Sequence, residues 1–272
     1  MMKLSDFVVQ FLVKKDICDL FLVSGGGIMH LLDSVGTNSD MRYYCNYHEQ
    51  ACAISAEVFC RVTNKIGACL VTTGPGGTNA LSGIAGAWVD SIPVLVLSGQ
   101  VRRDLIADYN MIRQKGPQEG NVVEMAKPVT KYAKTILDPN TIKYELEYAL
   151  FTATSGRPGP VWIDIPLDIQ NSQIDENNLP SFIPAVSASA RDNSKLEDDI
   201  NKFIKALKEA KRPLFMFGNG IHLSQSESLM MELLELVPIP IALPHTAKDL
   251  LPEENARYVG VFGTAGQRRA NF

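Results

Sequence analysis

Two short segments of the chain carry the residue types that could do chemistry. The run YHEQ at residues 47–50 places one carboxylate, Glu49, where a helix is predicted to begin. The run TGPGGTN at residues 73–79 follows an apolar strand and opens the next predicted helix, so its amides could receive an anion. The apolar helix face after Glu49 would disfavour ionisation of its carboxyl, which could then exchange a proton with a ring nitrogen near neutral pH.

Each segment also has a plain structural interpretation, and other chemistries lack their signatures. A glutamate in a first helical turn is stabilised by the helix dipole, and glycines in a strand-to-helix turn allow close packing. HExxH fails because position 52 is Cys, and neither GxSxG nor the Gly-Lys-Ser/Thr end of a P-loop is found. We therefore predict no metal ligands, no serine hydrolase and, without a GxGxxG fingerprint, no nicotinamide dehydrogenase.

The elements that must position these residues alternate between helix and strand. Strands are predicted at 19–23, 42–45, 67–72, 93–98 and 161–165, and helices at 3–15, 48–63, 75–89 and 141–154, with another opened by the glycines at 25–27. Because the strands are apolar on both faces, we predict an α/β fold with a doubly wound parallel sheet. Both glycine turns would lie at carboxyl ends of strands, where ligands usually bind.

A change in composition divides the chain. Residues 1–170 form the first predicted domain, and residues 171–193, rich in Asn, Gln, Ser and Pro, form a linker. Residues 194–272 repeat the α/β pattern, with helices at 194–211 and 227–236 and strands at 214–217 and 239–242. We expect this second, Rossmann-like domain to be incomplete, because so short a parallel sheet leaves a face uncovered.

Composition bounds the partners and the compartment. The net charge is −4 and no basic run is present, so we expect no nucleic-acid partner. No run reaches about 18 apolar residues, so we expect no membrane span. The five cysteines form no CxxC pair and lie in apolar patterns, which indicates a reducing compartment and predicts a cytoplasmic location.

Longer segments resemble the thiamine diphosphate-dependent family that includes acetolactate synthase. The resemblance is carried by residues 47–100, by ATSGRPGPVWIDIPLDIQ at 153–170, and by KRPLFMFGNG at 211–220, which is similar to the start of that family's middle domain. It covers essentially the whole chain. It implies that residues 1–170 are a pyrimidine-binding domain.

The resemblance implies roles for single residues. Glu49 would be the carboxyl that bonds the ring nitrogen N1′ of the aminopyrimidine. The other cofactor-binding residues that it implies are Gly25, Gly26, Thr73, Gly74, Asn79 and Gln118. The activity implied is decarboxylation of a 2-keto acid and transfer of the two-carbon or acyl unit to a carbonyl acceptor, in a homodimer or homotetramer.

Part of the family's machinery has no counterpart here. The Gly-Asp-Gly motif that holds the diphosphate and Mg²⁺ lies in the family's third domain, so we expect this chain to be inactive alone and part of a chain about twice as long. FAD is possible, since Gly218 and Gly220 fit a flavin site in the middle domain. The alternative is a non-catalytic binding or assembly module.

The sequence departs from the acetolactate synthase pattern on the substrate side. Ser24 stands where a proline is usual, Pro117 replaces an aromatic residue, and Leu167 replaces a lysine. The pyrimidine side is intact, so the resemblance indicates the cofactor and leaves the keto acid and the acceptor open. The pair Gln118-Glu119 lies in a long loop at 104–121, where polar pairs are usually solvated.

Overall fold

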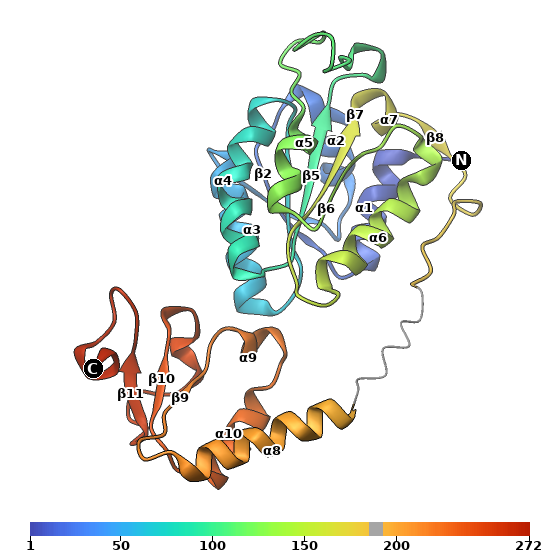
Figure 1. Ribbon diagram of the computed structural model, residues 1–272. Helices are drawn as coiled ribbons and strands as arrows, with labels where there is room; N and C mark the ends of the chain where they lie inside the picture. The colour runs from blue at the N-terminus through green and yellow to red at the C-terminus, as the bar shows by residue number, and fades with distance from the viewer. Residues whose placement is uncertain (185–192) are drawn as a thin grey trace. The chain divides into compact units, whose positions relative to one another are not determined.

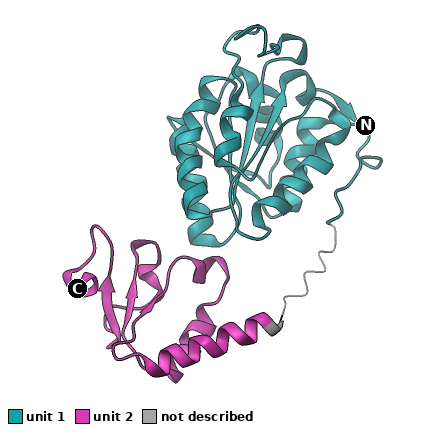
Figure 2. Ribbon diagram, viewed as in Figure 1, with its two compact units in different colours: residues 1–184 teal, residues 185–272 magenta. Residues whose placement is uncertain are grey.

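The computed structural model describes residues 1–184 and 193–272. The chain divides into two units, residues 1–184 and residues 185–272, and each has its own buried apolar core (Figure 2).

Six parallel strands form the sheet of the first unit, in the order β3-β2-β4-β5-β7-β6 (Figure 1). They are β2 (Asp19–Leu22), β3 (Arg42–Cys45), β4 (Gly67–Val71), β5 (Val94–Gln100), β6 (Tyr132–Thr135) and β7 (Val161–Pro166). Every residue of β4, β5 and β7 is buried, as expected of central strands covered on both faces. The predicted doubly wound parallel sheet is confirmed.

Helices cover both faces of this sheet. They are α1 (Leu4–Lys14), α2 (Met29–Thr37), α3 (Glu49–Thr63), α4 (Pro75–Asp90), α5 (Val122–Ala126), α6 (Ile142–Thr154) and α7 (Leu167–Gln170). Side chains of α1, α2 and α6 share one apolar cluster with alternate residues of the strands, such as Leu95 and Leu97 of β5. On the opposite face, α3 and α4 lie so close that a Cβ on Gly83 would be 2.6 Å from the Cβ of Ala53.

The strand order creates a switch point between β2 and β4. From β2 the chain passes through α2 to β3 on one side, whereas from β4 it passes through α4 to β5 on the other. Adjacent strands whose chains leave in opposite directions open a crevice at their carboxyl ends, which is where ligands bind in such sheets. The glycine turn at 25–27 and the turn at 72–74 both lie there.

Two strands at the edges of the sheet differ from the expectation. All four residues of β3 are exposed, so the prediction that every strand is apolar on both faces is wrong for this one. β3 has only β2 as a neighbour, and an edge strand needs cover on fewer sides. β6, at the other edge, was not predicted because its sequence, YAKT, has no apolar run.

The predicted linker at 171–193 is partly structured. Its residues Gln173–Ile174 form β8, which pairs antiparallel with β1 (Met2–Lys3) and so extends the first unit beyond residue 170. Residues 185–192 of the predicted linker lie outside the described residues.

The second unit is a smaller α/β structure. Its parallel sheet has the order β11-β10-β9, built from β9 (Phe215–Met216), β10 (Ile241–Leu243) and β11 (Tyr258–Val261). Its helices are α8 (Asn193–Glu209), α9 (Gly220–Leu223), α10 (Glu227–Leu236) and α11 (Arg268–Asn271). The sequence did not predict β11. None of the helices in the described ranges combines the length and apolarity that crossing a bilayer requires.

Candidate cofactor site

Glu49 lies at the first residue of α3, directly after the edge strand β3. The residue before it, His48, caps the helix, because its Nδ1 accepts a hydrogen bond from the amide of Gln50 at 3.1 Å. The Glu49 side chain is therefore not used as the cap. It is 9% exposed, and its Oε2 accepts a hydrogen bond from Nδ2 of Asn79 at 2.9 Å. The carboxyl thus faces the first turn of α4 and is sheltered from bulk solvent.

The turn between β4 and α4 depends on its glycines. Gly74 has a φ of +56°, and a Cβ there would lie 1.8 Å from the carbonyl oxygen of Gln118. A Cβ on Gly76 would lie 2.8 Å from Cγ2 of Thr72 and 3.4 Å from Oε1 of Glu49. A left-handed backbone and two close approaches leave no space for side chains. This turn brings the loop at 104–121 and the Glu49 carboxyl to the same place.

The turn after β2 completes the crevice. The amide of Gly27 donates a hydrogen bond to Oγ1 of Thr72 at 3.1 Å, and a Cβ on Gly25 would lie 2.4 Å from the Cβ of Thr72. Gly26 differs, because it is exposed and a Cβ there would meet nothing within 4 Å. The two glycine turns are therefore in contact at Gly25, while Gly26 faces open space.

The predicted cofactor-binding residues differ in what their side chains do. Thr73 is buried, and its hydroxyl donates to Oε1 of Gln100 at 2.9 Å, so this side chain points into the protein. Gln118 has an exposed side chain and a φ of +56°, and its backbone contacts Gly74. Glu49, Asn79, Gly74, Gln118 and Gly25 are thus brought together at the ends of β2, β3 and β4.

A buried polar cluster behind Thr73 was not predicted. It centres on Asp164 in β7, which is fully buried and lies next to Ser98 and Gln100 of β5 and Thr135 of β6. Burial raises the pKa of the Asp164 carboxyl to about 7. The signal in the sequence is a single carboxylate inside an apolar strand, VWIDI.

The prediction that Glu119 is solvated is wrong. Its side chain is 8% exposed and accepts three backbone hydrogen bonds, from Ala107 at 2.5 Å, Lys115 at 2.6 Å and Gly116 at 2.9 Å. Burial alone would raise the pKa of Glu119, but these amides outweigh it and hold the pKa below its usual range. Glu119 therefore organises the loop at 104–121 from inside, next to Gln118.

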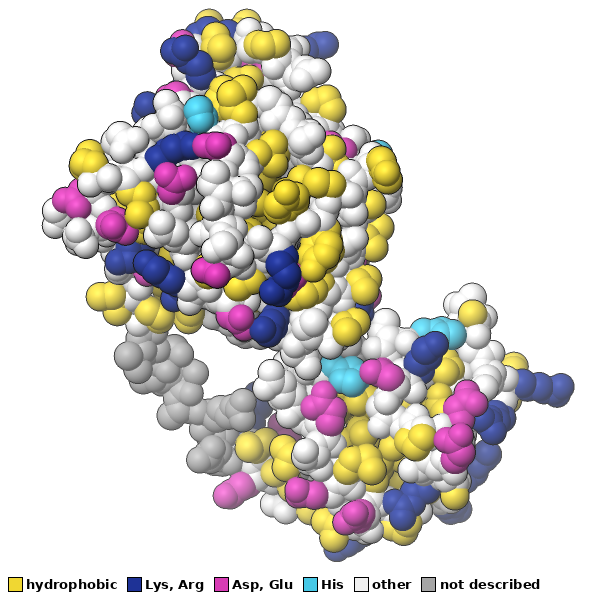
Figure 3. Space-filling model, turned by 180° about the vertical axis from the view of Figure 1, so that it is seen from behind, with side chains coloured by type: hydrophobic (Ala, Val, Ile, Leu, Met, Phe, Trp, Pro, Cys, Tyr) yellow, Lys and Arg dark blue, Asp and Glu magenta, His cyan; other side chains and the backbone are white. Residues whose placement is uncertain are grey.

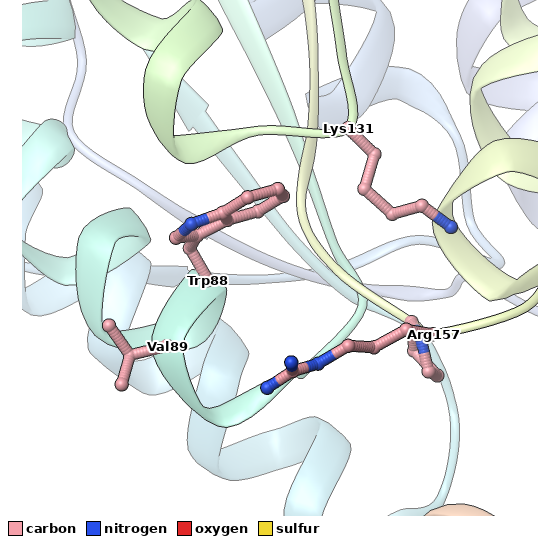
Figure 4. Close-up of a pocket in the computed structure, with 5 residues that line it drawn as sticks. Trp88, Val89, Lys131 and Arg157 are labelled. Atoms are coloured by element: carbon pink, nitrogen blue, oxygen red, sulfur yellow. The ribbon is translucent and has the colours of Figure 1, made fainter.

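A separate pocket of about 320 Å³ lies at the other end of α4. Figure 4 shows that it lies among Trp88, Val89, Lys131 and Arg157. Nζ of Lys131 donates to the carbonyl of Ser155 at 2.6 Å, and Nε of Arg157 donates to Oγ of Ser91 at 2.6 Å. None of the predicted site residues lines it. The described residues also contain no group of three or more His, Cys, Asp or Glu side chains that could hold a metal ion.

An open parallel sheet with two glycine turns and a sheltered carboxyl at its switch point defines a ligand-binding α/β domain of the nucleotide- and coenzyme-binding type. The chain matches the family model of the thiamine pyrophosphate enzyme N-terminal TPP binding domain over residues 2–125, and that of the thiamine pyrophosphate enzyme central domain over residues 200–272. Thiamine pyrophosphate is another name for thiamine diphosphate. The chain belongs to the thiamine pyrophosphate enzyme family.

Curated relatives match along nearly the whole chain. The probable acetolactate synthase large subunit of Methanocaldococcus jannaschii is 33% identical over 274 residues, which cover 100% of this chain and 45% of the relative. Acetolactate synthase isozyme 3 large subunit of Escherichia coli is 32% identical over 98% of this chain and 46% of the relative. Chloroplastic acetolactate synthase 2 of Nicotiana tabacum is 32% identical over 98% of this chain and 39% of the relative. The chain therefore spans less than half the length of these relatives.

Proposed function

We propose that this chain supplies the pyrimidine-binding part of an acetolactate synthase-like enzyme that decarboxylates a 2-keto acid and transfers the acyl unit to a carbonyl acceptor. The observation that carries the proposal is the Glu49–Asn79 pair, a sheltered carboxyl held by an amide at the switch point of the sheet. Membership of the thiamine pyrophosphate enzyme family supports the cofactor, and the names of the relatives support the reaction class.

The residues present fit an aminopyrimidine ring. A ring nitrogen needs one carboxyl that can donate or accept a proton, and Glu49 is a sheltered carboxyl at this edge. A flat ring also needs backbone that can come close to it, which Gly26 allows, because it is exposed and has nothing within 4 Å of its Cβ position. Bound there, thiamine diphosphate supplies the carbanion chemistry that decarboxylation of a 2-keto acid requires.

Each residue of the site has a task in this proposal. Asn79 holds Oε2 of Glu49 and leaves Oε1 near Gly76 free to hold a proton at the ring nitrogen. The burial of Glu49 excludes water from that proton. Gln118 is placed by its backbone contact with Gly74, so its exposed side chain can reach a substrate group.

Other parts of the proposal concern Mg²⁺, FAD and the location of the protein. Mg²⁺ would bind together with the diphosphate, on residues outside this chain. FAD would bind the second unit near Gly218 and Gly220, and the flavin absorbance of the purified full-length protein tests for it. A cytoplasmic location stays a prediction.

We also propose that the full-length protein is a homodimer or a pair of dimers. Exposed apolar side chains follow α3 and α4, namely Ile54, Val58, Val62, Trp88 and Val89. In Figure 3, which views the molecule from behind, hydrophobic side chains gather on the right flank of the first unit, the side of α3 and α4. Val58→Glu should weaken the dimer in sedimentation equilibrium, whereas Leu137→Glu, at an exposed apolar position outside α3 and α4, should not.

The test of the proposed function is Glu49→Gln in the full-length protein. Gln keeps the shape of the side chain and removes its proton transfer, so exchange of the C2 proton of bound thiamine diphosphate, followed by NMR, should be lost. Glu124→Gln, on the exposed surface of α5, is the control and should exchange normally. Exchange at the wild-type rate in Glu49→Gln would refute the role of Glu49.

A second candidate function is a non-catalytic binding or assembly module, which the exposed apolar side chains of α3 and α4 favour. The two candidates are separated by adding the remaining domain as a second chain. Turnover of a 2-keto acid on mixing supports the enzyme. A stable complex without turnover or cofactor supports the assembly module.

A further inference from the structure

A line of buried side chains runs across three strands behind the candidate cofactor site. Asp164 of β7 is paired in register with Ser98 of β5 on one side and with Thr135 of β6 on the other. Its Oδ1 accepts a hydrogen bond from Oγ of Ser98 at 2.5 Å, and its Oδ2 accepts one from Oγ1 of Thr135 at 3.1 Å. The same Oδ2 accepts a longer one, at 3.4 Å, from Nε2 of Gln100.

Gln100 connects this carboxyl to the site. Its Oε1 accepts from Oγ1 of Thr73 at 2.9 Å and from the amide of Val101 at 2.9 Å, and its Nε2 donates to the carbonyl of Gly120 at 3.0 Å and to Asp164. Both lone pairs and both N–H groups of the amide are therefore used. The Gln100 side chain therefore holds both the turn that contains Gly74 and the end of the loop that contains Gln118.

Asp164 and two backbone groups, the N–H of Val101 and the carbonyl of Gly120, together fix which way this amide points. A carboxylate accepts only, so it selects Nε2 of Gln100 and leaves Oε1 for Thr73 and Val101. In the flipped amide, Nε2 would face the N–H of Val101, and Oε1 would face the carbonyl of Gly120. Ser98 supports the charge, because it receives the indole N–H of Trp162 at 2.8 Å and so directs its own proton to Asp164.

We propose that Asp164 and Gln100 are positioning residues that set the spacing between the Thr73–Gly74 turn and the Gln118–Gly120 segment. This spacing determines the shape of the candidate cofactor site. The identity of the ligand rests on the proposed function, but the coupling of the two segments does not. Neither Asp164 nor Gln100 needs to touch the cofactor. Their effect passes through Thr73 and Gly120.

Titration of the Asp164 carboxyl should report on this network. Burial raises the pKa of Asp164 to about 7. From the loop at 104–121, the titratable group that faces it is Tyr109, whose pKa is raised by burial and then by the carboxylates of Glu119 and Asp164. Ser98, Gln100 and Thr135, which face Asp164 from β5 and β6, do not titrate. Protonation of Asp164 near neutral pH should therefore be felt at Gly74 and Gly120.

The first experiment uses the 272-residue chain without cofactor and measures backbone ¹⁵N relaxation. Gln100→Met keeps the side-chain length and removes all four hydrogen bonds, so the order parameters of Gly74 and Gly120 should fall from about 0.85 to below about 0.6. Ser34→Ala is the matched control, because it removes a buried hydroxyl of the same unit that bonds Ser5, Asp6 and the carbonyl of His30 instead of this network, and both glycines should stay rigid. Unchanged glycines in Gln100→Met, or equal loosening in Ser34→Ala, would overturn the proposal.

Two further variants keep the test decisive if Gln100→Met does not fold. Thr73→Val removes one link only, so Gly74 should loosen while Gly120 stays ordered. In wild type, the amide shifts of Gly74 and Gly120 should share a pH midpoint near 7, which Asp164→Asn should abolish. A midpoint that persists in Asp164→Asn, or order at Gly74 that is unchanged in Thr73→Val, would contradict the coupling.

The ligand is tested separately in the full-length protein with thiamine diphosphate and Mg²⁺. Gln100→Met should weaken binding about tenfold, the effect of losing roughly one or two hydrogen bonds, whereas Ser34→Ala should change it less than about twofold. If wild type binds no thiamine diphosphate, the proposed function fails while the relaxation result stands. If wild type and Gln100→Met bind equally, the positioning role fails while the proposed function stands.

Discussion

At the scale of single residues, the Glu49–Asn79 hydrogen bond gives the sheltered carboxyl its orientation. Asn79→Ala removes the donor and leaves a nearly buried carboxylate short of a partner, which should lower the free energy of unfolding by about 1–3 kcal/mol in urea. The neighbouring Thr78 is exposed, so Thr78→Ala should change it by less than about 0.5 kcal/mol. Equal losses in the two variants would show that the first turn of α4 matters and the hydrogen bond does not.

Asp164 makes stability depend on pH in an unusual direction for a carboxyl. Burial raises its pKa in the folded chain to about 7 from 3.8, so between these values the folded state holds a proton that the unfolded state has released. Stability should therefore fall as the pH rises from about 4 to 7.

Asp164→Asn should remove this part of the slope, which a series of urea unfolding curves at different pH values would show. Asp40→Asn changes an exposed carboxyl before β3 and should leave the slope in place. A slope that survives in Asp164→Asn would place the responsible group elsewhere.

At the scale of elements, the turn from β4 to α4 is specified by the backbone of Gly74. Its positive φ, together with the 1.8 Å approach of a Cβ to the Gln118 carbonyl, means that Gly74→Ala should destabilise the chain by more than about 2 kcal/mol. Gly26→Ala provides the matched comparison, since a Cβ there meets nothing and φ is not positive. Thermal unfolding of the two variants measures the difference, and similar melting temperatures would contradict the geometry.

The loop at 104–121 is held by Glu119. Glutamine at this position has one acceptor oxygen in place of two and turns an N–H₂ group toward backbone N–H donors. Glu119→Gln should therefore let the loop open, and trypsin should cut after Arg113 and Lys115 about tenfold faster. Glu124→Gln removes a carboxylate that pairs with Lys127 on the exposed side of α5, and its cleavage rate should match that of wild type.

At the scale of the whole molecule, the two units have separate cores, and His222 belongs to the second. Its Nδ1 lies 2.9 Å from Oε1 of Glu227 and its Nε2 lies 3.2 Å from Oδ1 of Asp249. Burial alone would lower the pKa of His222, but the two carboxylates outweigh it and raise the pKa.

A raised histidine pKa stabilises the fold below about pH 6.5, and the contribution is lost as the pH rises through the folded value. The protection factors for hydrogen exchange in residues 193–272, corrected for the intrinsic rate at each pH, should therefore fall above neutral pH, and His222→Gln should remove that fall. His245→Gln, at an exposed position, should not. The first unit should show no change from His222→Gln, because its core is separate.

Periodicity alone located most of the first sheet, because the central strands β4, β5 and β7 are apolar on both faces. It failed for β6, whose sequence YAKT carries no such run. In the second sheet it also failed for β11, a four-residue strand with a glycine in its sequence YVGV. The placement of Glu49 and Gly74 at the carboxyl ends of neighbouring strands was predictable, because a motif marks each of them. The roles of Glu119 and Gln100 were not predictable. Only the folded loop shows that Glu119 accepts hydrogen bonds from three amides and that Gln100 links two segments.

The close packing of Gly83 against Ala53 has a mechanical consequence. Helices that pack this closely at Gly83 resist sliding and rotating past each other, so α3 and α4 should move together. Glu49 and Asn79 lie at the N-terminal ends of these helices, and Trp88, at the C-terminal end of α4, lines the pocket in Figure 4. A displacement of α4 at Trp88 should therefore shift Asn79 and, through the hydrogen bond between them, the Glu49 carboxyl.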